Sequence, residues 1–217
     1  MKSSSVLPNN NSSEYGYGLA YKIACEQLAS IENIEKQCHN SDARYELIGT
    51  DKAITVDYLN QPYIITLPCI NISHKFNHDE VKLKDKILIL HYLTKAKGIV
   101  ISGKTITYKE LPEGVSYYRT FRKRAIQPLL TSFGKDPHRL LDAVEIIGGR
   151  KADYGDVAVT INAFKRVPIT LILWRGDEEF PPEGNIIFDS TITDYLAIED
   201  INVLCETIAW TLVRSAK

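Results

Sequence analysis

Apolar residues recur three and four positions apart along several stretches of the chain, which is the pattern of amphipathic helices. The first stretch predicts a helix over about residues 14–37. The second predicts a helix over about 80–97, where Asn77 and Glu80 have the spacing of a capping box and Gly98 follows as the terminating residue. Each helix should therefore place one apolar face against the rest of the fold.

Three further helices are expected in the second half of the chain. One covers about residues 117–132 and is interrupted or kinked near Pro128, because proline removes a backbone donor. The next begins at Asp136-Pro137, an N-cap residue followed by proline, and ends at Gly148-Gly149. The apolar spacing within Ile201–Leu212 predicts a long helix after the last strand.

Short apolar runs bounded by turn residues predict strands. In Ile54–Leu59 the apolar residues alternate with Thr55 and Asp57, as expected for a strand with one face in water. The stretch Pro168–Trp174 is apolar enough to be a central strand. The other strands are expected at Tyr45–Ile48, Tyr63–Leu67, 157–163 and Ile186–Phe188.

Strands and helices are segregated along the chain and do not alternate one by one. This order favours an α+β fold, in which antiparallel sheet segments carry amphipathic helices packed on them. Residues 14–217 are expected to form a single α+β domain. Residues 1–13 are polar and lack the apolar segment of a secretory signal, so a disordered polar tail is expected there.

Strands followed by a helix occur twice, which is compatible with a degenerate internal duplication. Segments 83–93 and 198–208 each carry an acidic residue, Asp85 and Asp200, two places after the first aliphatic residue. Two unrelated amphipathic helices can also share this spacing, so both interpretations stay open.

Composition and charge argue against several classes of function. The net charge of −1 gives no support to bulk electrostatic binding of nucleic acid. No apolar run reaches the roughly 20 residues that cross a bilayer, so we expect a cytoplasmic protein with no membrane partner. None of the four cysteines belongs to a C-x-x-C pair, and we expect free thiols, not ligands of zinc or of an iron–sulfur cluster.

The densest group of chemically active side chains lies between two expected strands, in Leu171–Asp189. Aromatic Trp174 and Phe180 flank the carboxylates Asp177-Glu178-Glu179. Carboxylates can hold a hard cation or perform acid–base chemistry, but their spacing here matches no calcium loop. A plain acidic turn is the favoured interpretation, and pairing with the basic stretch Arg119–Arg124 is an alternative.

Two other segments have the residue types of a binding site. His91 lies on the apolar face of the second expected helix, where an imidazole can ligate a metal, including the iron or cobalt of a tetrapyrrole. A core histidine bonded to its neighbours gives the same pattern. In segment 114–124, Tyr117, Tyr118 and Phe121 are interleaved with arginines, which suits stacking on a planar ligand or, equally, a helix whose aromatics enter the core.

Several short motifs resemble a single family. The most specific is Trp174–Pro181, which reads WRGDEEFP, and it is accompanied by Leu90–Leu93, Gly155-Asp156, Val167-Pro168, Phe188-Asp189, Tyr195-Leu196 and Glu199-Asp200. With these motifs the chain resembles, over about residues 15–215, the domain-of-unknown-function family numbered three-seven-eight-six, found mainly in anaerobic bacteria and archaea. Some relatives carry an added four-cysteine iron–sulfur domain like that of corrinoid iron–sulfur proteins.

The resemblance implies a role in corrinoid or one-carbon metabolism. The added cysteines are absent from this chain, so no iron–sulfur cluster of its own is expected. The leading hypothesis is a protein that binds a corrinoid (a cobalamin-type cofactor) or another planar molecule for trafficking, storage or delivery, with corrinoid-dependent proteins as candidate partners. The expected binding residues are His91, as the axial metal ligand, and Tyr117, Tyr118, Arg119, Phe121, Arg122, Tyr154, Trp174, Asp177, Glu178 and Phe180.

Two other classes of function compete with this hypothesis. An enzyme acting on the bound cofactor or on a small substrate would isolate a titratable residue in a pocket, with Asp177, Glu178 and Tyr154 as the first candidates. A protein-interaction module would instead expose its aromatic residues as a surface patch. The sequence supplies no partner nucleophile for the carboxylates, so binding is favoured over catalysis.

Overall fold

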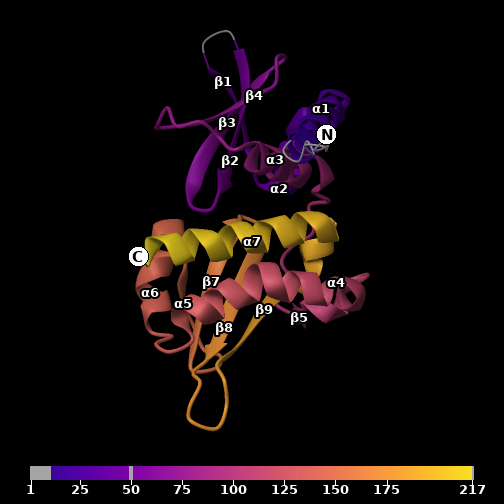
Figure 1. Ribbon diagram of the computed structural model, residues 1–217. Coiled ribbons are helices and arrows are strands. Elements are labelled where there is room, and N and C mark those ends of the chain that lie inside the picture. The colour runs from indigo at the N-terminus through magenta and orange to yellow at the C-terminus, as the bar shows by residue number, and fades with distance from the viewer. Residues whose placement is uncertain (1–10, 49–50, 217) are drawn as a thin grey trace, which may run out of the picture.

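The computed structural model describes the backbone of residues 11–48 and 51–216, which form two lobes stacked one above the other (Figure 1). Each lobe contains an antiparallel sheet, of four strands in the N-terminal lobe and five in the C-terminal lobe. Helices pack beside both sheets. The α+β fold class expected from the sequence is therefore confirmed.

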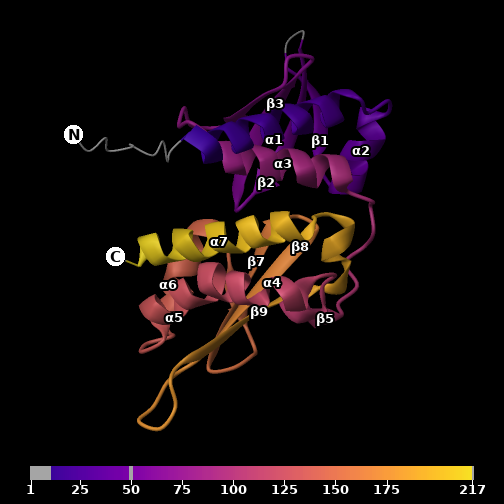
Figure 2. The same cartoon turned by 45° about the vertical axis from the view of Figure 1, so that its right-hand side comes forward.

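The N-terminal lobe is an antiparallel meander with the strand order β1-β2-β3-β4. Three helices lie beside it, and α3 packs against both α1 and α2 (Figure 2). The elements of this lobe are α1 (Asn11–Ala29), α2 (Ile34–Ser41), β1 (Arg44–Ile48), β2 (Asp51–Tyr58), β3 (Gln61–Leu67), β4 (Asn71–His74) and α3 (Leu83–Lys95).

The C-terminal lobe has the strand order β5-β9-β8-β7-β6, so the first strand of this lobe lies beside the last. Its helices gather on one side of the sheet, and α7 lies next to the N-terminal lobe (Figures 1 and 2). The elements are β5 (Thr105–Thr107), η1 (Tyr108–Glu110), α4 (Gly114–Phe121), η2 (Arg122–Ile126), α5 (Gln127–Phe133), α6 (Arg139–Val144), η3 (Glu145–Ile147), β6 (Arg150–Ala152), β7 (Val157–Phe164), β8 (Val167–Trp174), β9 (Glu183–Asp189), η4 (Ser190–Asp194) and α7 (Ile198–Ser215).

The first predicted helix, over 14–37, is wrong in its extent, because the chain divides it into α1 and α2. Asn33 caps the second of these, its side chain accepting a hydrogen bond from the Lys36 N–H at 2.9 Å. The tail expected over 1–13 lies mostly outside the described residues, and residues 11–13 belong to α1. A polar capping residue thus begins a second helix within the stretch that the apolar pattern predicted as one helix.

Two other predicted helices are confirmed with changes in detail. The second begins at Leu83 and not at residue 80, because Asn77 accepts from the nearby Asp79 N–H in a local turn and does not cap the helix. The third is interrupted as expected, but the interruption is a π-helical segment, Arg122–Ile126, just before Pro128. A wider helical turn of this kind accommodates Pro128, which has no backbone N–H to donate, without ending the helix.

The remaining elements follow the sequence closely, except for the shortest strands. The helix expected after Asp136-Pro137 begins at Arg139 and ends, as predicted, at Gly148, which adopts a left-handed conformation with φ of 67°. Strands β4, β5 and β6 were not predicted from the sequence. They have only three or four residues each, too few to show an alternating pattern.

The two lobes meet through an aromatic stack and a backbone hydrogen bond. The ring of Phe164, from β7, lies 4.0 Å from the ring of Tyr92 on α3 and 4.9 Å from that of Tyr58 on β2. The Leu59 N–H, after β2, donates to the Ala163 carbonyl oxygen at 2.9 Å. Buried side chains of both lobes consequently belong to one continuous hydrophobic cluster.

The same order of elements occurs in both lobes. A short helix, a four-stranded antiparallel meander and a longer helix follow one another as α2-β1-β2-β3-β4-α3 and again as α6-β6-β7-β8-β9-α7. Asp85 and Asp200 each occupy the third position of the closing helix. This arrangement is what a degenerate internal duplication would produce.

Candidate functional site

The structure brings two of the predicted binding aromatics, Tyr118 and Trp174, into one groove. The groove has a volume of about 290 Å³ and lies along the outer part of the five-stranded sheet. We call it the Trp174 groove, and its walls are formed by Thr107, Lys109, Tyr118, Trp174, Glu183, Gly184 and Asn185.

The groove exists because the edge strand β5 is short. Its three residues pair only with the far end of β9, from Ile187 to Asp189. The first part of β9, Glu183–Asn185, pairs with β8 on one side and lines the groove. Gly184 lets β9 come close to the helical layer, since a Cβ there would lie 3.2 Å from the Leu130 side chain.

A cation and an aromatic ring face each other in the groove. The ammonium of Lys109 lies 4.3 Å from the centroid of the Tyr118 ring, within cation–π range. Beneath them, Tyr108 stacks on Phe121 with ring centroids 3.8 Å apart. Phe121 is 1% exposed, so it supports the groove from the core and does not line it as the sequence analysis expected.

The carboxylate run next to the groove is organised by its first member. The Asp177 carboxylate accepts hydrogen bonds from the backbone N–H groups of Glu179 and Phe180 at 2.9 and 2.7 Å. These bonds lower the pKa of Asp177. Both bonds go to Oδ1, so Asp177 shapes the loop through one of its two carboxylate oxygens.

A second loop braces the start of this connection. The Arg175 N–H donates to the Asp156 carboxylate at 2.7 Å. Gly155, with φ of 53°, packs so closely that a Cβ would lie 3.2 Å from the Trp174 ring and 2.9 Å from the Leu173 carbonyl oxygen. The motif pairs Gly155-Asp156 and Trp174-Arg175, far apart in the sequence, are therefore in contact.

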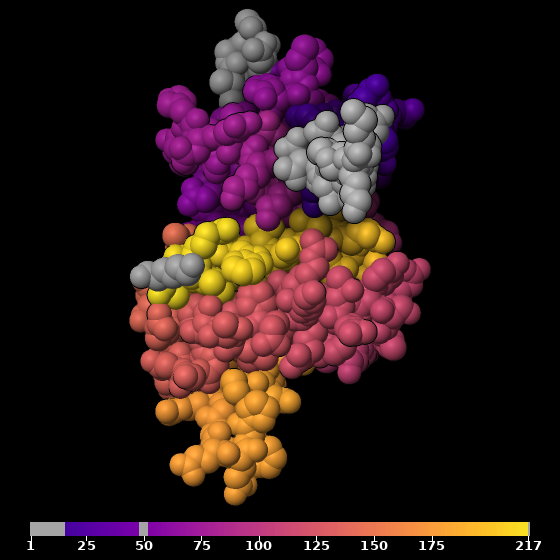
Figure 3. Space-filling model, viewed as in Figure 1, coloured from indigo at the N-terminus to yellow at the C-terminus, as the bar shows by residue number. Residues whose placement is uncertain are grey.

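Most of the other predicted binding residues are exposed to solvent. The loop between β8 and β9 projects from the base of the molecule (Figures 1 and 3), and Phe180 on it is 67% exposed. Trp174, at the loop's root, is 39% exposed. The other exposed candidates are Tyr117, Arg119, Arg122, Tyr154 and Glu178.

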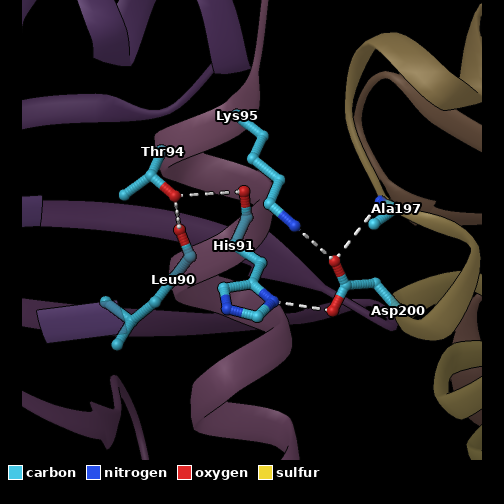
Figure 4. Close-up of polar contacts among 6 residues, drawn as sticks. All are labelled: Leu90, His91, Thr94, Lys95, Ala197 and Asp200. Carbon is cyan, nitrogen blue, oxygen red and sulfur yellow. Dashed lines mark hydrogen bonds and ion pairs between the residues drawn. The ribbon is translucent and has the colours of Figure 1, made fainter. Parts of the chain in front are cut away.

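His91 is found in a different setting, at the contact between the lobes. Its Nδ1 atom lies 2.6 Å from Oδ1 of Asp200 on α7 (Figure 4). The Lys95 ammonium donates to the other oxygen of Asp200 at 3.0 Å, and the Ala197 N–H donates to the same oxygen at 3.3 Å. The carboxylate of Asp200 thus joins two residues of α3 to the first turn of α7.

Electrostatics favour the charged form of this carboxylate. Burial alone would raise the pKa of Asp200, whose side chain is 9% exposed, but the hydrogen bond from His91 and the charges of His91 and Lys95 reverse the effect and lower it. The second ring nitrogen of His91 points away from Asp200 (Figure 4). A histidine held in this way through Nδ1 can use Nε2 as a ligand or as a base.

The Trp174 groove and His91 belong to different parts of the molecule. Helix α3, which carries His91, belongs to the upper lobe, whereas the β8–β9 loop projects from the far end of the lower lobe (Figures 1 and 2). His91 is not among the residues that line the Trp174 groove. His91 and Trp174, which the sequence analysis expected at one site, therefore lie in two different settings.

Sequence comparison places the chain in a family. The profile of a domain of unknown function, DUF3786, matches residues 33–211. The chain belongs to the DUF3786 family. This match confirms the family resemblance drawn from the motifs, and it includes the Trp174 groove and the His91–Asp200 pair. No curated protein and no solved structure matches the chain.

The sequence analysis did not identify several residues of the Trp174 groove and of the His91 cluster in this DUF3786 protein. Lys109 and Asn185 line the Trp174 groove, and Lys95 and Asp200 complete the His91 cluster. The one sequence signal for Asp200 was that it and Asp85 occupy equivalent positions in two helices. That signal did not indicate that Asp200 pairs with His91. Among the described residues, no helix is long and apolar enough to cross a membrane.

Proposed function

We propose that this chain is a cytoplasmic small-molecule binding protein that receives a planar ligand of the corrinoid type at the Trp174 groove. The observation that supports this proposal is the convergence of Tyr118 and Trp174 on one groove, with Lys109 over the Tyr118 ring. Aromatic faces suit a flat apolar macrocycle. Corrinoid-dependent proteins are the partners to which such a ligand would be delivered.

The chemical types in the groove match the edge of a corrin. Glu183 and Asn185 supply hydrogen-bond acceptors for peripheral amide N–H groups, and Lys109 and Asn185 supply donors for amide oxygens. The volume of about 290 Å³ is at the lower end of the range for drug-sized ligands, roughly 300–1,000 Å³. The groove therefore fits one edge of the macrocycle, and the rest of the ligand lies outside it.

His91 does not line the Trp174 groove, so a corrinoid held there would not be expected to contact its imidazole. The bound corrinoid would supply its own metal chemistry, and the chain's residues would supply only stacking and amide contacts. Binding in the groove and axial ligation by His91 can therefore be distinguished by removing the imidazole. Binding through the Trp174 groove survives the loss of the imidazole, whereas axial ligation does not.

The test is binding of hydroxocobalamin, followed by gel filtration and by its visible spectrum. We expect co-elution with the wild-type protein and a dissociation constant weakened roughly tenfold or more by Trp174→Leu or Tyr118→Leu. His91→Ala should bind like the wild type. Tyr117→Leu is the matched control, since Tyr117 is an exposed aromatic beside Tyr118 but is not part of the groove wall. Absence of co-elution with the wild type would refute the proposal.

A second candidate function, protein interaction through the β8–β9 loop, is supported by the exposure of Phe180. The loop projects into solvent, and an aromatic side chain 67% exposed at such a position is suited to insertion into a partner's apolar pocket. Phe180→Ala distinguishes the two functions. It should leave hydroxocobalamin binding unchanged if the groove is the site, and it should abolish capture of a corrinoid-dependent partner if the loop docks to it.

A further inference from the structure

A second hollow lies between the two lobes, far from the Trp174 groove. Its volume is about 530 Å³, well within the range of small-molecule sites, and both lobes contribute walls. We call it the interlobe cleft. It is lined by Asp42, Asp57, Asn60, Ile147, Gly148, Asn162 and Lys165. All but Ile147 and Gly148 carry polar or charged side chains, so the cleft suits a polar ligand.

The two walls carry opposite charges. The N-terminal lobe presents the carboxylates of Asp42 and Asp57, and the C-terminal lobe presents the ammonium of Lys165. Arg166, next to Lys165 in the β7–β8 turn, adds a guanidinium 3.8 Å from Asp42. Each wall also offers a carboxamide, from Asn60 and Asn162, which can donate or accept.

The charges across the cleft are paired only loosely. Lys165 lies 3.5 Å from Asp57 and Arg166 lies 3.8 Å from Asp42, whereas charge-assisted hydrogen bonds are about 2.7–2.9 Å long. In addition, the Arg166 Nε–H is buried without a hydrogen-bond partner among the described residues. That nitrogen faces Asp42, and Arg166 does not line the cleft, so Lys165 is the cation that a ligand in the cleft would meet.

The cleft is preformed where the lobes touch. The Asn60 side chain packs against Gly148 so tightly that a Cβ on Gly148 would lie 2.6 Å from the carboxamide carbon. Beside it, the Leu59 N–H donates to the Ala163 carbonyl oxygen across the lobes. The Tyr92 hydroxyl donates to the Ser41 carbonyl oxygen at 2.6 Å, which fixes the residue before Asp42. These contacts hold the charged walls at a set separation, and such preorganisation favours binding.

We propose that the interlobe cleft binds a zwitterion of the free α-amino acid type, with a polar side chain. Its ammonium would lie against Asp42 and Asp57, and its carboxylate against Lys165. The carboxamides of Asn60 and Asn162 would bond the side chain. A ligand with a single charge satisfies one wall and leaves the opposite wall with its loose pairs, so both charges are required.

The experiment is isothermal titration of the full chain, at low ionic strength, with L-glutamine, L-asparagine, L-serine and the dipeptide Gly-Gln. At least one of these should bind, and the single-charge analogues of that ligand, its N-acetyl derivative and its amide, should bind roughly tenfold or more weakly. Lys165→Met and Asp57→Asn should weaken binding by a similar factor. Lys151→Met and Asp153→Asn are matched controls, because both residues are exposed and lie outside the cleft.

Several results would overturn the proposal. They are no heat from any of the four probes, equal affinity for a zwitterion and its N-acetyl derivative, or binding that Lys165→Met leaves unchanged. Circular dichroism of each variant shows whether it is folded, and Lys165→Gln replaces Lys165→Met if the latter is not. Hydroxocobalamin binding by the same variants should be normal, since the Trp174 groove is a separate site.

Discussion

His91 and Asp200 are joined by a hydrogen bond of 2.6 Å between side chains 109 positions apart, one on each of the two helices that close the lobes. Lys95 bonds the other oxygen of the same carboxylate. The cluster ties α3 to α7, so it fixes the lobes relative to one another, whatever further chemistry His91 Nε2 performs. Both residues lie within the range that the DUF3786 profile matches.

Asp200→Asn should therefore destabilise the protein. The amide carries no charge for Lys95 and a weaker acceptor for His91, and we expect a loss of about 2 kcal/mol, less than for a fully buried ion pair because Lys95 is partly exposed. Urea unfolding measures it. The control is Asp194→Asn, which removes the more exposed pair with Lys97 and should cost about 0.5 kcal/mol. Equal effects of the two substitutions would contradict a special role for Asp200.

The stability of the wild type should also fall in acid for the same reason. The pKa of Asp200 is lower in the folded protein than its unfolded value of about 3.9. The carboxylate thus contributes its full stabilisation above that unfolded value, and the contribution is lost as the pH falls through the lowered folded value. Urea unfolding between about pH 5 and pH 2 should show a steeper decline for the wild type than for Asp200→Asn.

Asp189 should be essential for the segment that links the lobes. Its carboxylate, in a residue 6% exposed, accepts from the backbone N–H groups of Ser102, Gly103 and Thr191 and from two hydroxyls. Although burial alone would raise it, these bonds lower the pKa of Asp189. Asp189→Ala should cost about 3 kcal/mol, since five donors lose their acceptor and two of them belong to the buried Thr191.

Amide hydrogen exchange locates that effect. The amides of Ser102 and Gly103 should exchange faster in Asp189→Ala even under conditions where the rest of the protein is fully folded. Asp153→Asn, at an exposed turn position, provides the control. Unchanged exchange at both amides would show that other contacts hold the linking segment.

Gly155 should be irreplaceable, in contrast to another glycine with similar backbone angles. Gly155→Ala combines a positive φ of 53° with contacts of 2.8 Å to Ile172 and 2.9 Å to the Leu173 carbonyl oxygen, so we expect a cost of about 3 kcal/mol and displacement of Trp174. Gly103→Ala has φ of 75° but nothing within 4 Å, and should cost about 1 kcal/mol. Thermal unfolding compares them, and equal costs would mean that the close packing is unimportant.

The sequence predicts the long elements well because their patterns are long. Helix α7 and strands β7 and β8 bury whole faces over many residues, so their periodicity is plain. The edge strand β5 has three residues and is recognisable only through its pairing with β9. Local patterns carry no information on such pairing.

The same limit applies to the candidate site. Tyr118 and Trp174 could be recognised as candidate binding residues, but their meeting with Lys109 depends on how α4 packs beside the sheet. Phe121 was assigned to the ligand because aromatic residues at core and site positions look alike in a sequence. Contacts such as His91–Asp200 and Asn60–Gly148 depend on the docking of the two lobes, which no local pattern encodes.

Fluorescence should report directly on the Trp174 groove. The chain has two tryptophans, Trp174 in the groove and Trp210, 43% exposed, on α7. In a Trp210→Phe variant the emission comes from Trp174 alone, and a planar chromophore stacked there should quench most of it by contact. In the reciprocal Trp174→Phe variant, the emission of Trp210 should change far less at the same hydroxocobalamin concentration.

Lys109→Met should shift the quenching curve to roughly threefold higher concentration, because the loss of the cation–π contact frees the Tyr118 ring. Equal quenching of the two tryptophans would place the chromophore outside the groove.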